Sequence, residues 1–99
     1  MAIGVQLDFK GGTLEQYDQA AEHLGFLPGS PAAPEELFHW VTKTDEGLRI
    51  IDVWETREAF EQFLKAKIGA VAPKVGWDFP PEVQFFEVHN YFAGGRRRS

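Results

Sequence analysis

The chain has 99 residues, of which 43% are hydrophobic and 14% aromatic, enough for one compact domain with a modest core. Its net charge of −5 is unlike that of nucleic-acid-binding proteins, which present a basic face, so we expect no nucleic-acid partner. The absence of cysteine excludes disulfides and thiolate metal sites. Because no apolar run is long enough to span a bilayer and the N-terminus lacks a signal-peptide pattern, we expect a cytoplasmic protein with no membrane partner.

The first part of the chain predicts a strand, a helix and a long loop. Apolar side chains alternate over residues 2–9, which is typical of a half-buried strand. Thr13 and Gln16 then have the spacing of a capping box, so a helix should begin after Thr13 and end at Gly25. Residues 25–36 contain three prolines and two glycines and therefore predict a loop of unusual length.

The remainder of the chain predicts a hairpin, a second helix and a last strand. Strands are expected at 37–43 and 48–55, joined by the turn sequence TDEG. Thr56 can cap a helix over 57–68. Prolines and glycines in 69–82 then predict a long connection, and 82–92 predicts the final strand.

The order β-α-β-β-α-β predicts an α+β, ferredoxin-like fold: a four-stranded antiparallel sheet with two helices on one face. We expect a single domain over 1–93, because no internal linker is apparent. The glycine- and arginine-rich end, 94–99, is expected to be a disordered basic tail.

Alternation within the strands divides the sheet residues into two groups. We expect the helices to cover one group, which consists of Ile3, Val5, Leu7, Ile51, Val53, Phe86 and Val88. The opposite face would then carry Gln6, Asp8, Ile50, Asp52, Trp54, Phe85, Glu87, His89 and Tyr91. For the strand 37–43 the orientation stays open, so His39 can lie on either face. The mixed face is too aromatic for water and too polar for a core, and we expect a second copy of the chain to cover it and enclose a cavity.

The candidate catalytic residues on this face are His89, Glu87 and Asp52. An imidazole beside a carboxylate in a dry cavity can move protons, because the carboxylate fixes the tautomer and raises the basicity of the ring. The candidate substrate-binding residues, which would form a flat wall and its polar edge, are His39, Trp54, Tyr91, Phe85 and Gln6. Two alternatives remain: the polar cluster is structural and fixes dimer register, or His39, His89, Asp52 and Glu87 ligate a metal ion. We assign no metal and no cofactor.

The element order, the run IIDVWETREAFEQFLKAKIG and the run PPEVQFFEVHNYF resemble the dimeric α/β-barrel superfamily, in particular small proteins related to the antibiotic-biosynthesis monooxygenases. The resemblance extends to Phe92 and implies two sheets pairing into a dimeric barrel, hence a homodimer. Haem-degrading members place a histidine on the second helix, and 57–68 has none. The resemblance, taken with the candidate base, implies a cofactor-independent monooxygenase or an isomerase acting on a small cyclic or aromatic metabolite. The alternative is a non-catalytic module that binds a small ligand or a partner.

Overall fold

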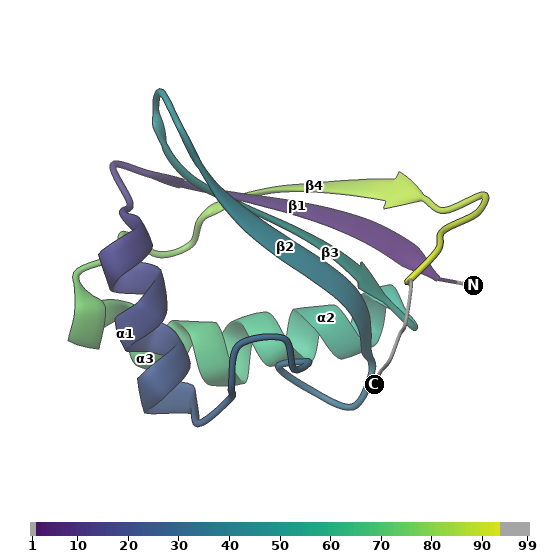
Figure 1. Ribbon diagram of the computed structural model, residues 1–99, viewed down its shortest axis with the longest axis horizontal. Helices are drawn as coiled ribbons and strands as arrows, with labels where there is room; N and C mark the ends of the chain where they lie inside the picture. The colour runs from purple at the N-terminus through teal and green to yellow at the C-terminus, as the bar shows by residue number, and fades with distance from the viewer. Residues whose placement is uncertain (1, 94–99) are drawn as a thin grey trace.

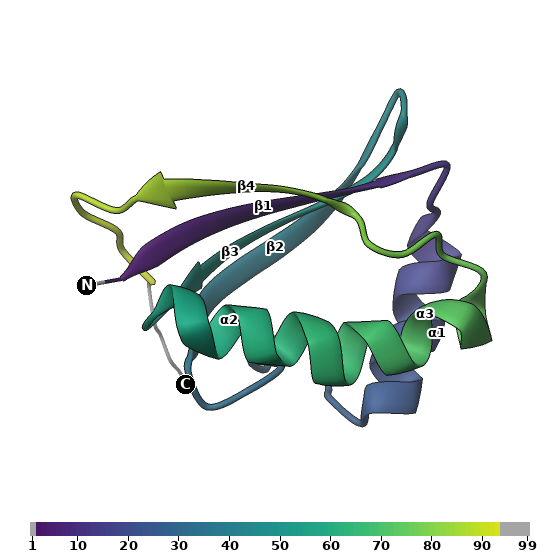
Figure 2. The same ribbon diagram turned by 180° about the vertical axis from the view of Figure 1, so that it is seen from behind.

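The computed structural model describes residues 2–93, and the predicted tail at 94–99 lies outside them. Eight elements follow one another along the chain: β1 (Ile3–Lys10), α1 (Leu14–Leu24), β2 (Glu36–Thr44), β3 (Gly47–Trp54), α2 (Arg57–Phe63), the π-helical turn η1 (Leu64–Ile68), α3 (Gly69–Val75) and β4 (Glu82–Glu87). The four strands form one sheet in the order β2-β3-β1-β4, and every neighbouring pair is antiparallel. The helices lie on one face of this sheet (Figures 1 and 2). The ferredoxin-like fold predicted from the sequence is therefore confirmed.

Local signals explain where the first helix begins and ends. The Thr13 hydroxyl accepts a hydrogen bond from the Gln16 amide at 3.1 Å, and the Gln16 side chain accepts one from the Thr13 amide at 3.0 Å. Gly25 ends the helix with a φ of 80°, a backbone conformation that costs other residues energy. Gln16 also donates to the Val75 carbonyl at 2.9 Å, which ties the start of α1 to the end of α3.

The second helical segment is longer than predicted. We expected a helix over 57–68 followed by a loop. The elements α2 and η1 cover that range, but helical structure then continues through α3 to Val75. Pro73 lies inside α3, although proline removes one backbone donor and usually ends a helix. Val71, Ala72 and Val75 are buried around it, so tertiary packing outweighs the local cost. Gly76, with a φ of 87°, ends the segment.

The last strand is shorter than predicted. Instead of running to residue 92, β4 ends at Glu87, so His89 and Tyr91 follow the strand and do not take part in its alternation. Both residues are exposed. This removes the main reason for grouping them with the sheet residues.

The pairing register also corrects the predicted faces of the sheet. Val5 is opposite Asp52 on one side and opposite Phe85 on the other, and Ile3 is opposite Trp54 and Glu87. Directly paired residues share a face, so Ile50, Asp52, Trp54, Phe85 and Glu87 lie on the helix side together with Ile3, Val5 and Leu7. The open face carries instead Gln6, Asp8, Ile51, Val53 and Phe86. The residues of β3 were grouped correctly by alternation. The group expected on the open face, however, lies on the helix side, next to Ile3, Val5 and Leu7 of β1.

The core forms between the helices and this inner face. Its fully buried large side chains are Trp54, Phe60, Leu48, Val5 and Val71. Trp77, which precedes β4, is 7% exposed and stacks on Phe9 at a ring-centroid distance of 4.3 Å. Within residues 2–93, no helix has the length and apolar character required to cross a bilayer.

Candidate functional site

A β-bulge brings two polar side chains of β2 to the inner face. Glu36 pairs with Trp54, whereas Phe38 pairs with the adjacent Val53, so β2 contains one extra residue between them. Beyond the bulge, His39 pairs with Asp52 and therefore faces inward. The open orientation of β2 is thus resolved, with Phe38 and Trp40 outward and His39 inward.

Glu36 and His39 are in direct polar contact. His39 Nδ1 lies 3.0 Å from Glu36 Oε2, and the side chains are 18% and 3% exposed, respectively. The other oxygen, Glu36 Oε1, accepts a hydrogen bond from the Ala32 amide at 2.6 Å. The end of the long loop therefore holds the carboxylate in position against the imidazole.

Asp52 is the third polar group and the most enclosed, with an exposure of 4%. Its Oδ2 accepts a hydrogen bond from Trp54 Nε1 at 3.0 Å, whereas within residues 2–93 no donor reaches its Oδ1. One atom each from Asp52, Glu36 and His39 lie within 4.8 Å of one another. We refer to these three residues as the inner polar cluster.

Burial and mutual proximity shift the proton affinities of this cluster. The hydrogen bond to Glu36 raises the pKa of His39 above its ordinary value, although burial opposes that shift. Burial, reinforced by the charge of Glu36, raises the pKa of Asp52 well above its usual range. Burial together with the nearby carboxylates also raises the pKa of Tyr17 on α1 to about 12. His39 and Asp52 therefore retain their protons more strongly than the same side chains do in water.

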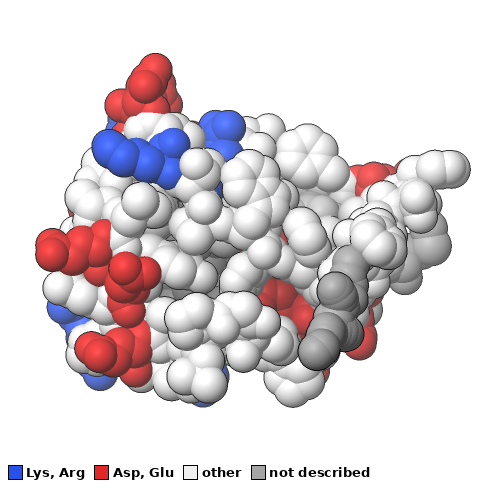
Figure 3. Space-filling view, viewed as in Figure 1, with Lys and Arg blue, Asp and Glu red and all other residues white. Residues whose placement is uncertain are grey.

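A surface groove leads to the cluster. Its volume is about 570 Å³, and α1, residues 26–31, β2 and Ala93 line it. Tyr17, Phe26, Glu36 and His39 line this groove and also a small interior cavity of about 30 Å³, which Asp52 borders from the other side. The two spaces thus meet at the inner polar cluster. Figure 3 views the molecule from this side, where uncharged side chains cover most of the surface and acidic ones gather over α1 and the β2–β3 hairpin.

The structure brings three predicted site residues together and separates the others. His39, Asp52 and Trp54 lie in or against the inner polar cluster. Phe85 is on the inner face too, but it packs edge-on against Phe60 and under the Arg57 guanidinium. Glu87, His89 and Tyr91 are exposed at or beyond the end of β4 and do not line the groove.

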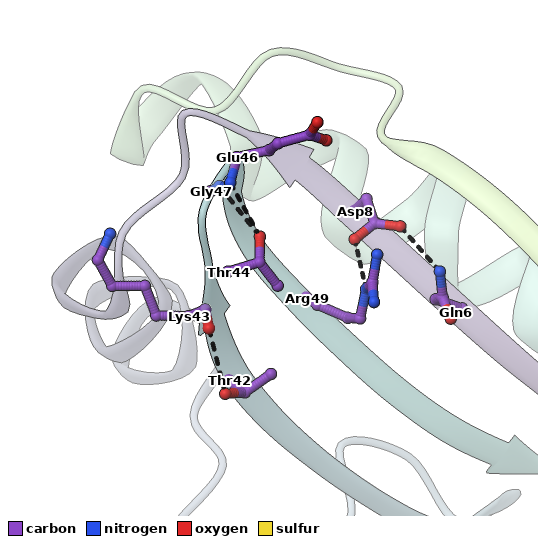
Figure 4. Close-up of polar contacts among 8 residues, drawn as sticks. All are labelled: Gln6, Asp8, Thr42, Lys43, Thr44, Glu46, Gly47 and Arg49. Atoms are coloured by element: carbon purple, nitrogen blue, oxygen red, sulfur yellow. Dashed lines mark hydrogen bonds and ion pairs between the residues drawn. The ribbon is translucent and has the colours of Figure 1, made fainter.

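Gln6 lies on the opposite face of the sheet. It donates to Asp8 Oδ2 at 3.0 Å, while Arg49 Nε donates to Asp8 Oδ1 at 2.7 Å (Figure 4). This network links β1 to β3 on the open face, and none of its three residues lines the groove. Gln6 thus lies on the face on which it was predicted, and it does not line the groove.

Sequence reasoning missed two residues of the site, Glu36 and Tyr17. Glu36 follows a proline-rich loop, and its side chain faces inward only because of the bulge. No residue pattern in the sequence predicts that bulge. Tyr17 was part of the apolar stripe of α1, and its polar hydroxyl is the only signal that set it apart.

No protein-family model and no curated protein matches this sequence. Solved structures do resemble it. SnoaB, a cofactor-independent oxygenase from Streptomyces nogalater, is 14% identical, with a TM-score of 0.57 over 94% of this chain and 97% of SnoaB. A point mutant of SnoaB is 15% identical, with a TM-score of 0.53 over 94% and 96% of the two chains. The chain has the fold of these oxygenases.

A candidate antibiotic biosynthesis monooxygenase from Deinococcus radiodurans gives a similar result. It is 14% identical, with a TM-score of 0.53 over 93% of this chain and 96% of that protein. The resemblance predicted from the sequence is therefore confirmed for the fold. At such identities, shared architecture does not carry over an activity.

Proposed function

We propose that this protein is a cofactor-independent oxygenase that removes a proton from a small cyclic or aromatic metabolite and lets the resulting anion react with dioxygen. The observation that carries the proposal is the 3.0 Å contact between His39 and Glu36 where the groove meets the interior. The likeness of the fold to SnoaB, a cofactor-independent oxygenase, supports the same class of reaction.

His39 has the arrangement of a general base. Its Nδ1–H donates to Glu36 Oε2, which leaves Nε2 with a lone pair to accept a proton. When Nε2 takes the proton, the nearby negative charge of Glu36 stabilises the imidazolium. Asp52 borders the interior cavity and does not line the groove, so it acts on the substrate only through this pair. His39 is the catalytic residue of the proposal, and Glu36 and Asp52 are positioning residues.

The groove supports a compact, largely apolar substrate. Its volume of about 570 Å³ is within the usual range of small-molecule sites. The aromatic and aliphatic side chains in its wall are Phe26, Leu27, Leu37, Phe38, Trp40 and Val41. Such walls favour a flat ring, while the polar cluster at the inner end selects the acidic position of that ring.

The oxygenation step balances without a bound cofactor. His39 takes one proton from a ring CH₂ next to a carbonyl group, and the carbanion adds dioxygen to form a C–O bond. The peroxide receives the proton back and loses water as the second hydrogen of the carbon leaves, which gives a carbonyl group. Overall, the CH₂ group and O₂ become C=O and H₂O. Return of the proton to another carbon, without oxygen, would make the protein an isomerase.

Oxygen uptake with ring ketones that carry an acidic CH₂ group tests this proposal, with indane-1,3-dione as the first probe. We expect the wild-type protein to consume oxygen and His39→Gln to lose activity by a factor of about 100 or more. The matched control is His89→Gln, which changes an exposed histidine outside the groove and should retain the wild-type rate. Equal rates in wild type and His39→Gln would overturn the role of His39. Binding of the probe with no turnover would favour the non-catalytic alternative.

We further propose that the open face of the sheet pairs with a second copy of the chain. Phe38, Trp40 and Phe86 are 36%, 48% and 50% exposed on this face, and Phe38 and Trp40 also border the groove. Exposed aromatic side chains on one face are typical of a protein–protein interface. Light scattering should show a dimer that Phe86→Glu converts to a monomer, whereas Phe92→Glu, beyond the sheet, should remain dimeric. A monomeric wild-type protein would contradict this arrangement.

A further inference from the structure

The inner polar cluster has a feature that proton transfer does not require. Each of its two carboxylates accepts, at one oxygen, a hydrogen bond from a group outside the cluster. Glu36 Oε1 accepts from the Ala32 amide, and Asp52 Oδ2 accepts from Trp54 Nε1. Of the second oxygens, Glu36 Oε2 contacts His39 Nδ1 within the cluster, and no donor among residues 2–93 reaches Asp52 Oδ1. Metal-binding carboxylates and histidines are oriented by outer hydrogen bonds in this same manner.

The spacing of the three groups fits the coordination shell of a small cation. Glu36 Oε2 and His39 Nδ1 are 3.0 Å apart, and the whole set, Asp52 included, lies within 4.8 Å. Two ligands at about 2.0–2.1 Å from a tetrahedral zinc ion are about 3.3 Å apart. The Glu36–His39 pair therefore needs almost no movement, and Asp52 needs a small shift toward them.

A second and independent observation concerns Asp52 alone. Its Oδ1 atom is buried, yet no donor in the described part of the chain reaches it. Leaving a buried polar atom unpartnered costs about 1–3 kcal/mol, so native structures rarely keep one without a reason. Asp52 is 4% exposed and borders the interior cavity. A cation between Asp52, Glu36 and His39 would give this oxygen a partner.

We propose that Glu36, His39 and Asp52 bind one divalent transition-metal ion, such as Zn²⁺ or Co²⁺. One imidazole nitrogen and two carboxylate oxygens suit such an ion better than Ca²⁺ or Mg²⁺, which take shells of oxygen atoms. Three protein ligands leave one position for water, at the place where the groove meets the interior. Binding itself is independent of the proposed function. Its effect rests on that function, because an ion on His39 Nδ1 removes the free base and should inhibit oxygenation.

Cobalt titration tests the site directly. Purified protein is first stripped with EDTA and transferred to metal-free buffer, and Co²⁺ is added while the visible absorption of the bound ion is recorded. We expect one Co²⁺ per chain, displaced by Zn²⁺. His39→Gln and Asp52→Asn should abolish the absorption, and Trp54→Phe should weaken binding by about 10–100-fold because it removes only an outer hydrogen bond. His89→Gln is the matched control and should bind as the wild type does.

The outcomes separate this inference from the proposed function, because the Co²⁺ spectrum needs no turnover. Absence of Co²⁺ binding would overturn the metal site whether or not oxygen is consumed. Equal binding by wild type, His39→Gln and Asp52→Asn would also overturn it, since the ion would then lie elsewhere. Circular dichroism and the melting temperature of each stripped variant show that it is folded. Binding that requires all three residues supports the site, even in a protein that consumes no oxygen.

Discussion

Glu36 and His39 lie on the same face of the sheet and meet at 3.0 Å, although they are three residues apart on one strand. In a regular strand an odd separation places two side chains on opposite faces. The extra residue between Glu36 and Phe38 reverses this relation. The inner polar cluster therefore depends on a local irregularity of β2, in a strand that lies at the edge of the sheet.

Replacing Glu36 by glutamine should lower the pKa of His39. The hydrogen bond to the Glu36 carboxylate is the largest cause of the raised pKa of His39, and glutamine keeps the size of the side chain while removing its charge. NMR titration of the His39 ring in the presence of EDTA measures the change. Glu82→Gln, which neutralises an exposed carboxylate on β4, is the control and should leave His39 as it is. The prediction fails if His39 titrates at the same pH in Glu36→Gln and wild type.

Replacing Asp52 by asparagine should make the free energy of unfolding less sensitive to rising pH. Because the pKa of Asp52 is raised from 3.8 in the folded state, the folded protein binds this proton more tightly than the unfolded chain does. The free energy of unfolding therefore falls as the pH rises from 3.8, the ordinary pKa of the group, through the raised pKa that Asp52 has in the folded state. His39 acts in the same direction above 6.5, where its stabilising proton is lost as the pH passes its raised pKa.

Urea unfolding at several pH values, with EDTA present, measures this effect. The difference in stability between Asp52→Asn and wild type should move in favour of the variant as the pH rises. Asp78→Asn makes the same change in net charge at an exposed position, and its difference from wild type serves as the correction. A difference for Asp52→Asn that falls with rising pH would show that the sign is wrong.

Gly47 should tolerate alanine much less well than Gly25, although both have positive φ angles, of 152° and 80°. A Cβ at position 47 would overlap the Phe9 carbonyl oxygen and the Gly11 and Gly12 amides, whereas a Cβ at position 25 has nothing within 4 Å. Backbone strain of this kind costs about 1–3 kcal/mol, and the overlap at position 47 adds to it. Urea unfolding of both variants measures the two costs. Similar costs would contradict the close approach of the hairpin to the end of β1.

The fold could be predicted because its signals are local. Alternation over 2–9, the capping box at Thr13 and the turn at 44–47 each depend on a few neighbouring residues, and the structure has all three elements. Helix 57–68 was found but ended too early, because Pro73 is a breaker by local rules and is tolerated only through packing. The comparisons then confirm the fold at 14% identity.

The site could be predicted only in part, because it depends on pairing between strands. In β3, both Ile50 and Ile51 are apolar, so alternation does not say which of them faces the helices. A buried carboxylate is unusual, and the sequence therefore favoured placing Asp52 on the open face. The structure buries it instead, with Trp54 Nε1 as the partner of one oxygen. His39 and Asp52 were among the predicted candidates. Their neighbour Glu36 could not be predicted, because its side chain faces inward only through the bulge in β2.

Replacing Trp54 by phenylalanine should destabilise the protein more than the same change at Trp77. Both indoles are buried and packed against phenylalanine rings, so the loss of ring volume is similar. Trp54 Nε1 donates to Asp52, whereas Trp77 Nε1 finds no acceptor among the residues that the structure describes. Only the change at Trp54 leaves an additional buried acceptor without a partner, which should cost about 1–3 kcal/mol more.

Urea unfolding of the two single variants measures this difference, and a double variant assigns its cause. Asp52→Leu removes the buried carboxyl group, so adding Trp54→Phe to that background should cost only the loss of packing. The excess over Trp77→Phe should then disappear. If the excess persists without the carboxyl group, the cost of Trp54→Phe comes from packing against Phe60 and Phe63, and the Trp54–Asp52 hydrogen bond contributes little to holding the inner polar cluster.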